Sequence, residues 1–437
     1  MGAARLREHR LERIIHRAAV RSGAAAVGRD RATRRPPHGG RAVSGTGAHI
    51  GGSVAAGFEP VLEAFRLSAD GDAGTGAALS IRHRGEVVVD LWTGVADSRT
   101  GREWTGDTPS VIFSCTKGVM SILLARLVQE GRLDYEAPVA DYWPEYAVAG
   151  KSATQVKHAI SHRAGLSAPR VDWSREDILD WSRAVALLEA QEPLWHPGAA
   201  WSYHAITHGW LTGELVRRVT GLLPGEYLRQ LVTTPLAVDA WVGLPEERHA
   251  DVAHLVVGPT LRDLTARQAD EARHLDVDWL GRAMTLGGAL PPELVGDDDG
   301  FNRADVQAAQ IPGAGGIASA RALATIWSAT VHATNGQRLL DDATLELATR
   351  EQSAGPPHFT APGPWPRWGM GFQLDSAARR YLGAESFGHD GAGGQVAFAD
   401  RRHEIGFAFL TNRMEADDPR GTAIVDALGQ VLDDAGR

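Results

Sequence analysis

The stretch Val111-Ile112-Phe113-Ser114-Cys115-Thr116-Lys117-Gly118 decides how the rest of the chain is interpreted. It leads into the apolar run 118–128, which predicts a buried helix. Three residues make about one helical turn, so Ser114 and Lys117 can lie on the same face of that helix. A serine becomes a nucleophile only when a base activates it, and a neutral amine one turn away can be that base.

Lysine is rare in this chain, which makes Lys117 informative. Only Lys117, Lys151 and Lys157 occur among the 45 Lys and Arg residues. Arginine keeps its proton in proteins, whereas a desolvated lysine can lose it. A lysine three residues after Ser114 therefore indicates a site that needs a deprotonatable amine. Ser-x-x-Lys alone is a common tetrapeptide, so this prediction needs partners elsewhere in the sequence.

The size and charge of the chain limit its class. With 437 residues, it is long enough for two domains or for one large α/β domain with an insertion. The net charge is −9, yet residues 1–50 hold eleven arginines against three acidic residues. The remainder is strongly acidic, so we expect no nucleic-acid partner. No run approaches ~18 consecutive apolar residues, so we expect no membrane-spanning helix.

The N-terminal segment 1–56 is predicted to be an arginine-rich, disordered extension, with a basic binding arm as the alternative. It lacks the apolar core of a secretory signal. Cys115 is the single cysteine, which excludes an intramolecular disulfide and a cysteine-based zinc site. We expect a cytoplasmic protein with neither cofactor nor metal.

Apolar spacing predicts the regular structure. Helices are expected at 58–65, 177–190, 209–220 and 422–432. Strands are expected at 77–83 and 86–92, joined by an Arg84-Gly85 turn, and at 368–374, 395–399 and 405–411. Strands at both ends with helices between predict an α/β fold of the α+β type. Its antiparallel sheet is built from both chain ends and flanked by helices. We expect this sheet domain at 57–130 and 300–437, and a mostly helical inserted domain at 131–299.

Tyr203 is a candidate partner of the Ser114–Lys117 pair. It ends the loop 197–203, just before a predicted helix. A tyrosine beside an ammonium group can exist partly as phenolate and can pass a proton to a leaving group. Considered alone, it is equally compatible with an ordinary core tyrosine.

The glycine-rich stretch 388–394 is a second candidate partner. Its glycines let the backbone approach a ligand closely. The N–H of Ala392 could pair with that of Ser114 as an oxyanion hole, and His389 could orient a substrate or tune the tyrosine. As an isolated feature, such a stretch is usually just a turn.

Ser114-x-x-Lys117, Tyr203 and His389-x-Gly391, in this order, resemble the motifs of the serine β-lactamase/penicillin-binding-protein superfamily. The resemblance is closest to the class C-like branch that includes family VIII carboxylesterases, and it covers roughly residue 57 to the C-terminus. Supporting stretches are 160–166, 195–198, 209–216 and 315–319. It implies an antiparallel sheet, a helical domain and an active site in the groove between them.

The resemblance also implies roles for the candidate residues. Ser114 would be acylated, Lys117 would be its base and Tyr203 would move the proton. The backbone of Ser114 and Ala392 would form the oxyanion hole. His389 would occupy the position of the lysine in the family's Lys-Thr-Gly motif.

Two departures from the family pattern bear on the substrate. Lactamases of this branch carry Tyr-x-Asn, whereas the third position here is Ala205. His389 stands where the family has the lysine of Lys-Thr-Gly, which pairs with a substrate carboxylate. Asp390 beside it would repel an anion. Both favour a neutral ester over a penicillin, so we expect a soluble serine hydrolase acting on small to medium acyl esters. An amidase, peptidase or acyltransferase of the same fold, weak β-lactamase activity and a catalytically silent scaffold are the alternatives.

Four further residues near Tyr203 attract attention. Trp195 and Trp201 flank its loop and either line an apolar acyl pocket or pack in the core. His204 and His208 are four residues apart, and no third ligand accompanies them in a known arrangement. We therefore expect surface or groove-lining histidines rather than a metal pair. The sequence leaves a monomer and a homo-oligomer open.

Overall fold

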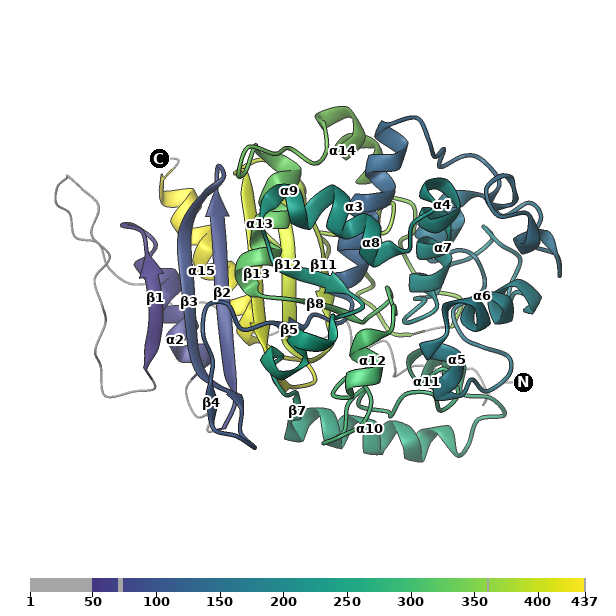
Figure 1. The fold of residues 1–437 in the computed structure, drawn as a ribbon, viewed down its shortest axis with the longest axis horizontal. Coiled ribbons are helices and arrows are strands. Elements are labelled where there is room, and N and C mark those ends of the chain that lie inside the picture. Colours follow the sequence, from purple (N-terminus) through teal and green to yellow (C-terminus); the bar gives the residue numbers. More distant parts are fainter. Residues whose placement is uncertain (1–48, 70–73, 360, 436–437) are drawn as a thin grey trace.

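The computed structural model describes residues 49–69, 74–359 and 361–435, and its centre is an antiparallel sheet (Figure 1). The strand order is β1-β3-β2-β13-β12-β11-β10-β9, with β4 paired to β3. The N-terminal strands are β1 (Ile50–Val54), β2 (Gly76–His83), β3 (Glu86–Asp97) and β4 (Arg102–Glu103). The C-terminal strands are β9 (Arg367–Trp368), β10 (Gln373–Leu374), β11 (Ser386–Gly391), β12 (Gln395–Asp400) and β13 (Ile405–Thr411). β2 pairs with β13, which confirms the predicted sheet built from both chain ends.

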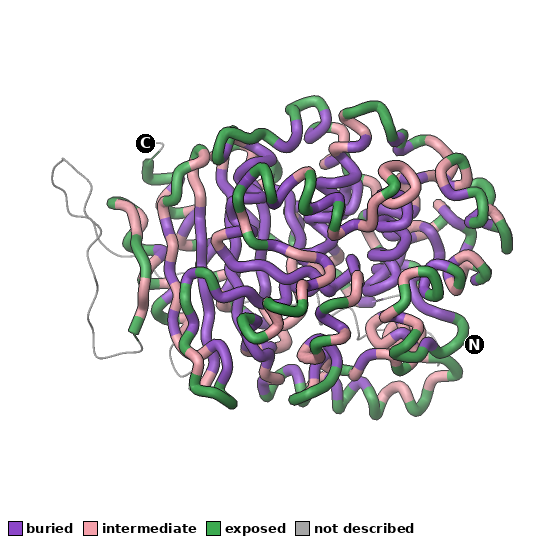
Figure 2. The backbone as a smooth tube through the Cα atoms, viewed as in Figure 1, coloured by how far each residue is buried: buried purple, intermediate pink, exposed green. Residues whose placement is uncertain are grey.

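The two faces of the sheet carry side chains of different size, because successive residues of a strand point to opposite faces. One face packs against α2 (Glu59–Ser68) and α15 (Arg420–Ala435) with large residues: Leu79, Ile81, Phe398, Phe407 and Phe409. The other packs against α3 (Cys115–Gln129) and α13 (Ala320–Val331) with small ones: Ala78, Ala397, Ala399 and Ala408. The central strands are buried on both faces (Figure 2). The small residues of β2, β12 and β13 therefore let α13 approach the sheet closely.

Most helices between the two sets of strands are short. They are α4 (Val156–Ile160), α5 (Arg175–Leu179), α6 (Trp181–Ala190), α7 (His208–Thr220), α8 (Pro224–Leu228), α9 (Thr234–Leu236), α10 (Pro259–Ala272), α11 (Trp279–Thr285), α12 (Ala304–Ala308) and α14 (Asp342–Ala348). A small sheet joins β5 (Ser110–Val111), β8 (Gly316–Ala318) and β6 (Ala240–Val242), and β7 (Val256–Val257) pairs with β14 (Arg413–Met414). The division into domains at 131–299 stays a prediction. Within the described residues, no helix combines the length and apolar character needed to cross a membrane.

Several local predictions differ from the structure. The helix expected at 177–190 is broken at Asp180, whose side chain accepts hydrogen bonds from the N–H groups of Ser182 and Arg183 and so begins α6 anew. The strand expected at 368–374 is two short strands, because Gly371 turns the chain with φ +79°.

The predicted disordered segment 1–56 is also wrong in part. β1 lies inside it and pairs with β3 along its whole length. Its sequence, Ile-Gly-Gly-Ser-Val, has only two apolar residues, Ile50 and Val54, which pack against the core beside α2, and backbone pairing with β3 holds the rest of the strand. Residues 1–48 lie outside the described residues.

Candidate active site

Ser114 stands at the N-terminus of α3, after a tight turn that leaves β5. Phe113 in that turn has φ +43°, a left-handed conformation that is uncommon outside glycine. Its ring is fully buried and packs edge-on against Phe301, 5.5 Å between centroids. The N–H of Thr116 donates to Phe113 O at 2.9 Å. Packing thus holds a strained turn that places half-buried Ser114 at the end of the helix.

Lys117 is fully buried, and its Nζ has three oxygen neighbours. They are Ser114 Oγ at 3.0 Å, Ala205 O at 2.6 Å and Gly313 O at 2.6 Å. Among the described residues, no carboxylate forms an ion pair with it. Burial accordingly lowers the pKa of Lys117 well below its ordinary value.

These contacts match the donors and acceptors of a neutral amine. A neutral lysine has two N–H groups and one lone pair. The carbonyls of Ala205 and Gly313 can only accept, so they take the two N–H groups. The lone pair is then left for the hydroxyl of Ser114, which becomes the donor. The geometry is therefore compatible with a neutral Lys117 that accepts the hydroxyl proton of Ser114.

Two glycines bring the second carbonyl to Lys117. A Cβ at Gly209 would lie 2.0 Å from Gly313 N, and one at Gly313 would lie 2.3 Å from Ile206 O. Only glycine at both positions lets the loop before β8 rest against the start of α7. Sequence reasoning missed Gly313, because no motif marks a carbonyl as a lysine partner.

Tyr203 lies beside this pair. Its ring centroid is 4.9 Å from Lys117 Nζ, and it stacks on Trp368 at 5.4 Å. Burial raises the pKa of Tyr203, and the neighbouring Ser114 hydroxyl opposes that rise. Ser114, Lys117 and Tyr203, predicted from separate parts of the chain, thus lie together.

The stretch 388–394 is the end of β11 and the turn that follows, rather than a turn alone. Gly391 and Ala392 line a cavity of about 80 Å³ that also contains Ser114 and Tyr203. A Cβ at Gly391 would come within 2.4 Å of Ile112 O, so glycine is required where β11 passes the turn before Ser114.

His389 differs from its expected place. Its side chain is 1% exposed and is not among the residues that line the cavity. Its ring lies 6.0 Å from that of Tyr203 and 5.3 Å from that of Trp368, and its Nδ1 is 2.7 Å from Asp390 O. A substrate-orienting role is therefore not supported, whereas an effect on Tyr203 fits the geometry.

Asp390 has a partner that the sequence did not suggest. Arg379 Nε lies 2.7 Å from Asp390 Oδ2, and Tyr381 donates to Asp390 Oδ1 at 3.2 Å. Burial raises the pKa of Asp390, and Arg379 opposes that rise. The expectation that Asp390 repels anions is therefore wrong in its simple form, because the carboxylate is paired with a buried arginine. Arg379 and Asp390 both line the cavity.

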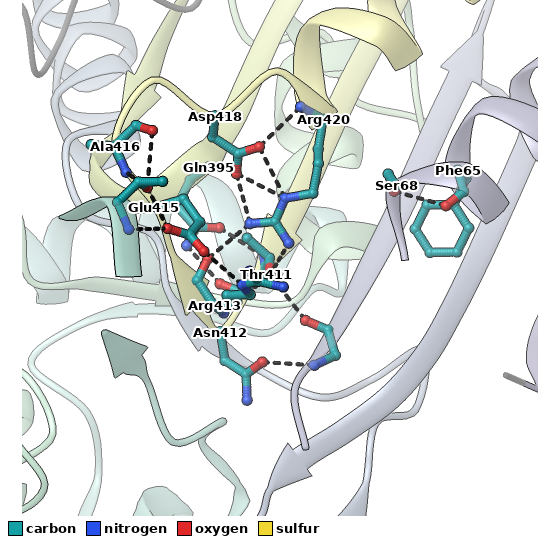
Figure 3. A network of polar contacts seen from close by, with 12 residues as sticks. Phe65, Ser68, Gln395, Thr411, Asn412, Arg413, Glu415, Ala416, Asp418 and Arg420 are labelled. Atoms are coloured by element: carbon teal, nitrogen blue, oxygen red, sulfur yellow. Dashed lines mark hydrogen bonds and ion pairs between the residues drawn. The ribbon is translucent and has the colours of Figure 1, made fainter. Parts of the chain in front are cut away.

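Figure 3 shows a polar network within residues 411–420, of which Glu415, Asp417 and Asp418 line the cavity at Ser114. Arg420 Nη2 donates to Asp418 Oδ2 at 2.6 Å, and Arg413 Nε donates to Glu415 Oε1 at 2.7 Å. The Gln395 side chain exchanges two hydrogen bonds with the backbone of Thr411. The rim carboxylates of Asp418 and Glu415 are thus tied to arginines.

Trp195 and Trp201 follow the core-packing alternative. Neither is among the described residues that line the cavity. The ring of Trp195 contacts those of His204 and His358, and Trp201 Nε1 donates to Ala354 O at 3.1 Å. These contacts support the core-packing alternative for both tryptophans.

His204 and His208 are fully buried, so the expectation of surface or groove-lining histidines is wrong. They surround His162, whose ring centroid lies 5.8 Å from His204 and 4.8 Å from His208. Burial lowers the pKa of both His204 and His208 to about 3. The described residues contain no group of three or more His, Cys, Asp or Glu that could hold a metal ion.

Comparison with known proteins agrees with this geometry. The model of the family described as Beta-lactamase matches residues 65–430, most of the chain. The chain belongs to the beta-lactamase family. This beta-lactamase family member is 31% identical over 379 residues to "Esterase/beta-lactamase LipL" of Mycobacterium tuberculosis. The alignment covers 84% of this chain and 84% of the relative.

Two solved structures are similar to this family member over most of their length. A family VIII carboxylesterase shares 32% identity, with a TM-score of 0.77 over 88% of this chain and 100% of its own. A penicillin-binding protein homologue from Caulobacter crescentus shares 35% identity, with a TM-score of 0.76 over the same shares. The beta-lactamase family member is a serine hydrolase.

Proposed function

We propose that the protein is a carboxylesterase that hydrolyses small to medium acyl esters through a covalent acyl-enzyme on Ser114. The observation that carries the proposal is the environment of Lys117 Nζ. Two carbonyls occupy its N–H groups, burial favours its neutral form, and its lone pair is left for Ser114 Oγ at 3.0 Å. The names of the relatives, one an esterase/beta-lactamase and one a carboxylesterase, support the same class of substrate.

The proposed reaction has two halves. In the first, Lys117 takes the Ser114 proton while Oγ attacks the ester carbon, and the backbone N–H groups of Ser114 and Ala392 stabilise the oxyanion. Tyr203 passes a proton from Lys117 to the leaving alkoxide, which departs as the alcohol. In the second, water attacks the acyl-enzyme, the acid leaves, and Ser114 recovers its proton.

A neutral ester fits the charges around Ser114. Asp390 is paired with Arg379, and Glu415 and Asp418 are paired with Arg413 and Arg420. Ala205, which is buried, replaces the asparagine of the family's Tyr-x-Asn motif. It therefore offers no amide group to the acylamide side chain of a β-lactam.

The experiment compares hydrolysis of p-nitrophenyl butyrate by the wild type and by Ser114→Ala. We expect turnover in the wild type and its loss in the variant. Cys115→Ser is the matched control, because Cys115 is the neighbouring nucleophile, is fully buried, and its thiol pKa is raised by that burial. It should retain activity. Equal turnover in wild type and Ser114→Ala would refute the proposal.

Weak hydrolysis of β-lactams is a second candidate, favoured by the double name of the Mycobacterium tuberculosis relative. Nitrocefin turnover that requires Ser114 tests it. We expect a kcat/KM far below that for esters, since Ala205 replaces the asparagine.

A further inference from the structure

A second cavity, which we call the chamber, adjoins the cavity at Ser114. It has a volume of about 390 Å³, and α10, α11 and residues 287–294 form most of its wall. α10 runs along the lower edge of the view in Figure 1. The residues that line both cavities are Met284, Leu294, Ala392, Gly393 and Glu415. The chamber therefore lies next to the place where a group attached to a carbonyl carbon at Ser114 would extend.

The chamber suits a hydrocarbon rather than an ion. Its apolar lining includes Leu261, Met284, Leu290, Pro292, Leu294 and Met414. The charged side chains that reach it have partners in the protein. Arg282 pairs with Asp172 at 2.7 Å, and Glu293 accepts from Thr265 Oγ1 at 2.6 Å. A charged ligand would have to compete with these contacts.

The position of Tyr203 indicates which half of an ester, the acyl group or the alcohol, enters the chamber. Tyr203 lines the cavity at Ser114 but is not among the residues that line the chamber. In the proposed reaction, Tyr203 gives a proton to the leaving alcohol, so the alcohol lies on its side. The acyl group extends away from it, past Ala392 and Gly393, toward the chamber.

We propose that the chamber binds the acyl chain of medium-chain esters, and that Met284 and Leu294 at its entrance determine the chain length accepted. An apolar cavity of about 150 Å³ holds benzene, so the chamber has room for a chain of ~6–10 carbons. This inference rests on the proposed esterase function of Ser114.

The test is a series of p-nitrophenyl esters from acetate to octanoate. Burial of one CH₂ is worth ~0.8 kcal/mol, so kcat/KM should rise up to about fourfold for each methylene added. Met284→Trp narrows the entrance and should lower kcat/KM for hexanoate at least ~10-fold more than it lowers kcat/KM for acetate. Leu280→Trp is the matched control, since Leu280 is on the same helix but is not among the residues that line the chamber. It should leave both values near those of the wild type.

An unchanged ratio of hexanoate to acetate in Met284→Trp would overturn the inference. A second result would also overturn it. If kcat/KM for acetate esters rose with the length of their alcohol, and Met284→Trp removed that rise, the chamber would hold the leaving group.

Fluorophosphonates separate this inference from the proposed function. Their alkyl group on phosphorus takes the acyl position, and labelling of Ser114 requires no ester turnover. Faster labelling by octyl than by methyl fluorophosphonate, lost in Met284→Trp, would support the chamber even if no ester were hydrolysed. Ester hydrolysis without any dependence on acyl length would support the esterase and refute the chamber.

Discussion

Acidification from pH 7 to pH 5 should destabilise the folded protein through its buried histidines. His162, His204 and His208 are fully buried, and burial lowers the pKa of each. The hydrogen bonds of His162 and His204 require the neutral form of each ring. His204 Nε2 accepts from Leu166 N–H, and His162 Nδ1 accepts from His204 N–H, which leaves no room for a second proton.

The sign and size of the effect follow from linkage. Because the folded pKa lies below the unfolded value of about 6.5, the unfolded chain binds protons that the folded chain does not. Stability therefore falls as the pH drops below ~6.5 and continues to fall toward the folded pKa. With a folded pKa of about 3, His204 and His208 each cost about 2 kcal/mol at pH 5 relative to pH 7. His162 adds a loss of the same sign.

The assay is urea unfolding at half-unit steps from pH 7.5 to pH 5. This window lies above the ordinary pKa of carboxylates, so the change comes from the buried histidines and from Lys117, whose pKa burial also lowers. The histidine share is isolated by replacing one histidine. His208→Gln, which can still donate to Ile160 O, should lose ~2 kcal/mol less over the same range. His274→Gln, at an exposed position, should show the full wild-type loss. A free energy of unfolding that stays flat from pH 7 to pH 5 would refute the reasoning.

Three more predictions concern the site. Lys117→Arg should lower kcat/KM for p-nitrophenyl butyrate by ~10²–10⁴-fold, because arginine cannot accept the serine proton. In the wild type, kcat/KM should fall as the pH is lowered and Lys117 becomes protonated. Gly391→Ala should lower kcat by up to ~10²-fold and leave the circular dichroism spectrum unchanged. The added Cβ would meet Ile112 O at 2.4 Å and displace the end of β11, which leads to Ala392. Arg379→Met should destabilise the fold by ~3–5 kcal/mol in urea unfolding, because it leaves Asp390 buried without its cation; the double variant with Asp390→Asn should recover most of that loss.

Local patterns in the sequence predict the centre of the site well. The apolar run after Ser114 is long enough to predict a buried helix, which α3 confirms, and Lys117 is conspicuous in a chain of arginines. The hairpin around Arg84-Gly85 and the strands 395–399 and 405–411 follow from alternation and a glycine turn, and the structure confirms them.

The surroundings of the site depend on contacts between distant segments, which local patterns do not record. Gly313 reaches Lys117 only because Gly209 leaves space for its loop. The burial of His204 and His208 depends on their packing around His162. The chamber combines α10, α11 and β14, and no local pattern near Tyr203 predicts it.

The pairing of β2 with β13 has a consequence for synthesis. A ribosome releases β2 and β3 long before β13, so the edge of β2 that pairs with β13 stays open until that distant strand has been made. β11, which carries Gly391 past the turn before Ser114, also follows α3 at a long distance in the chain. A nascent chain that ends before β11 therefore contains Ser114 and Lys117 but lacks the strand that passes the serine turn. In the proposed reaction such a chain would lack the backbone N–H of Ala392.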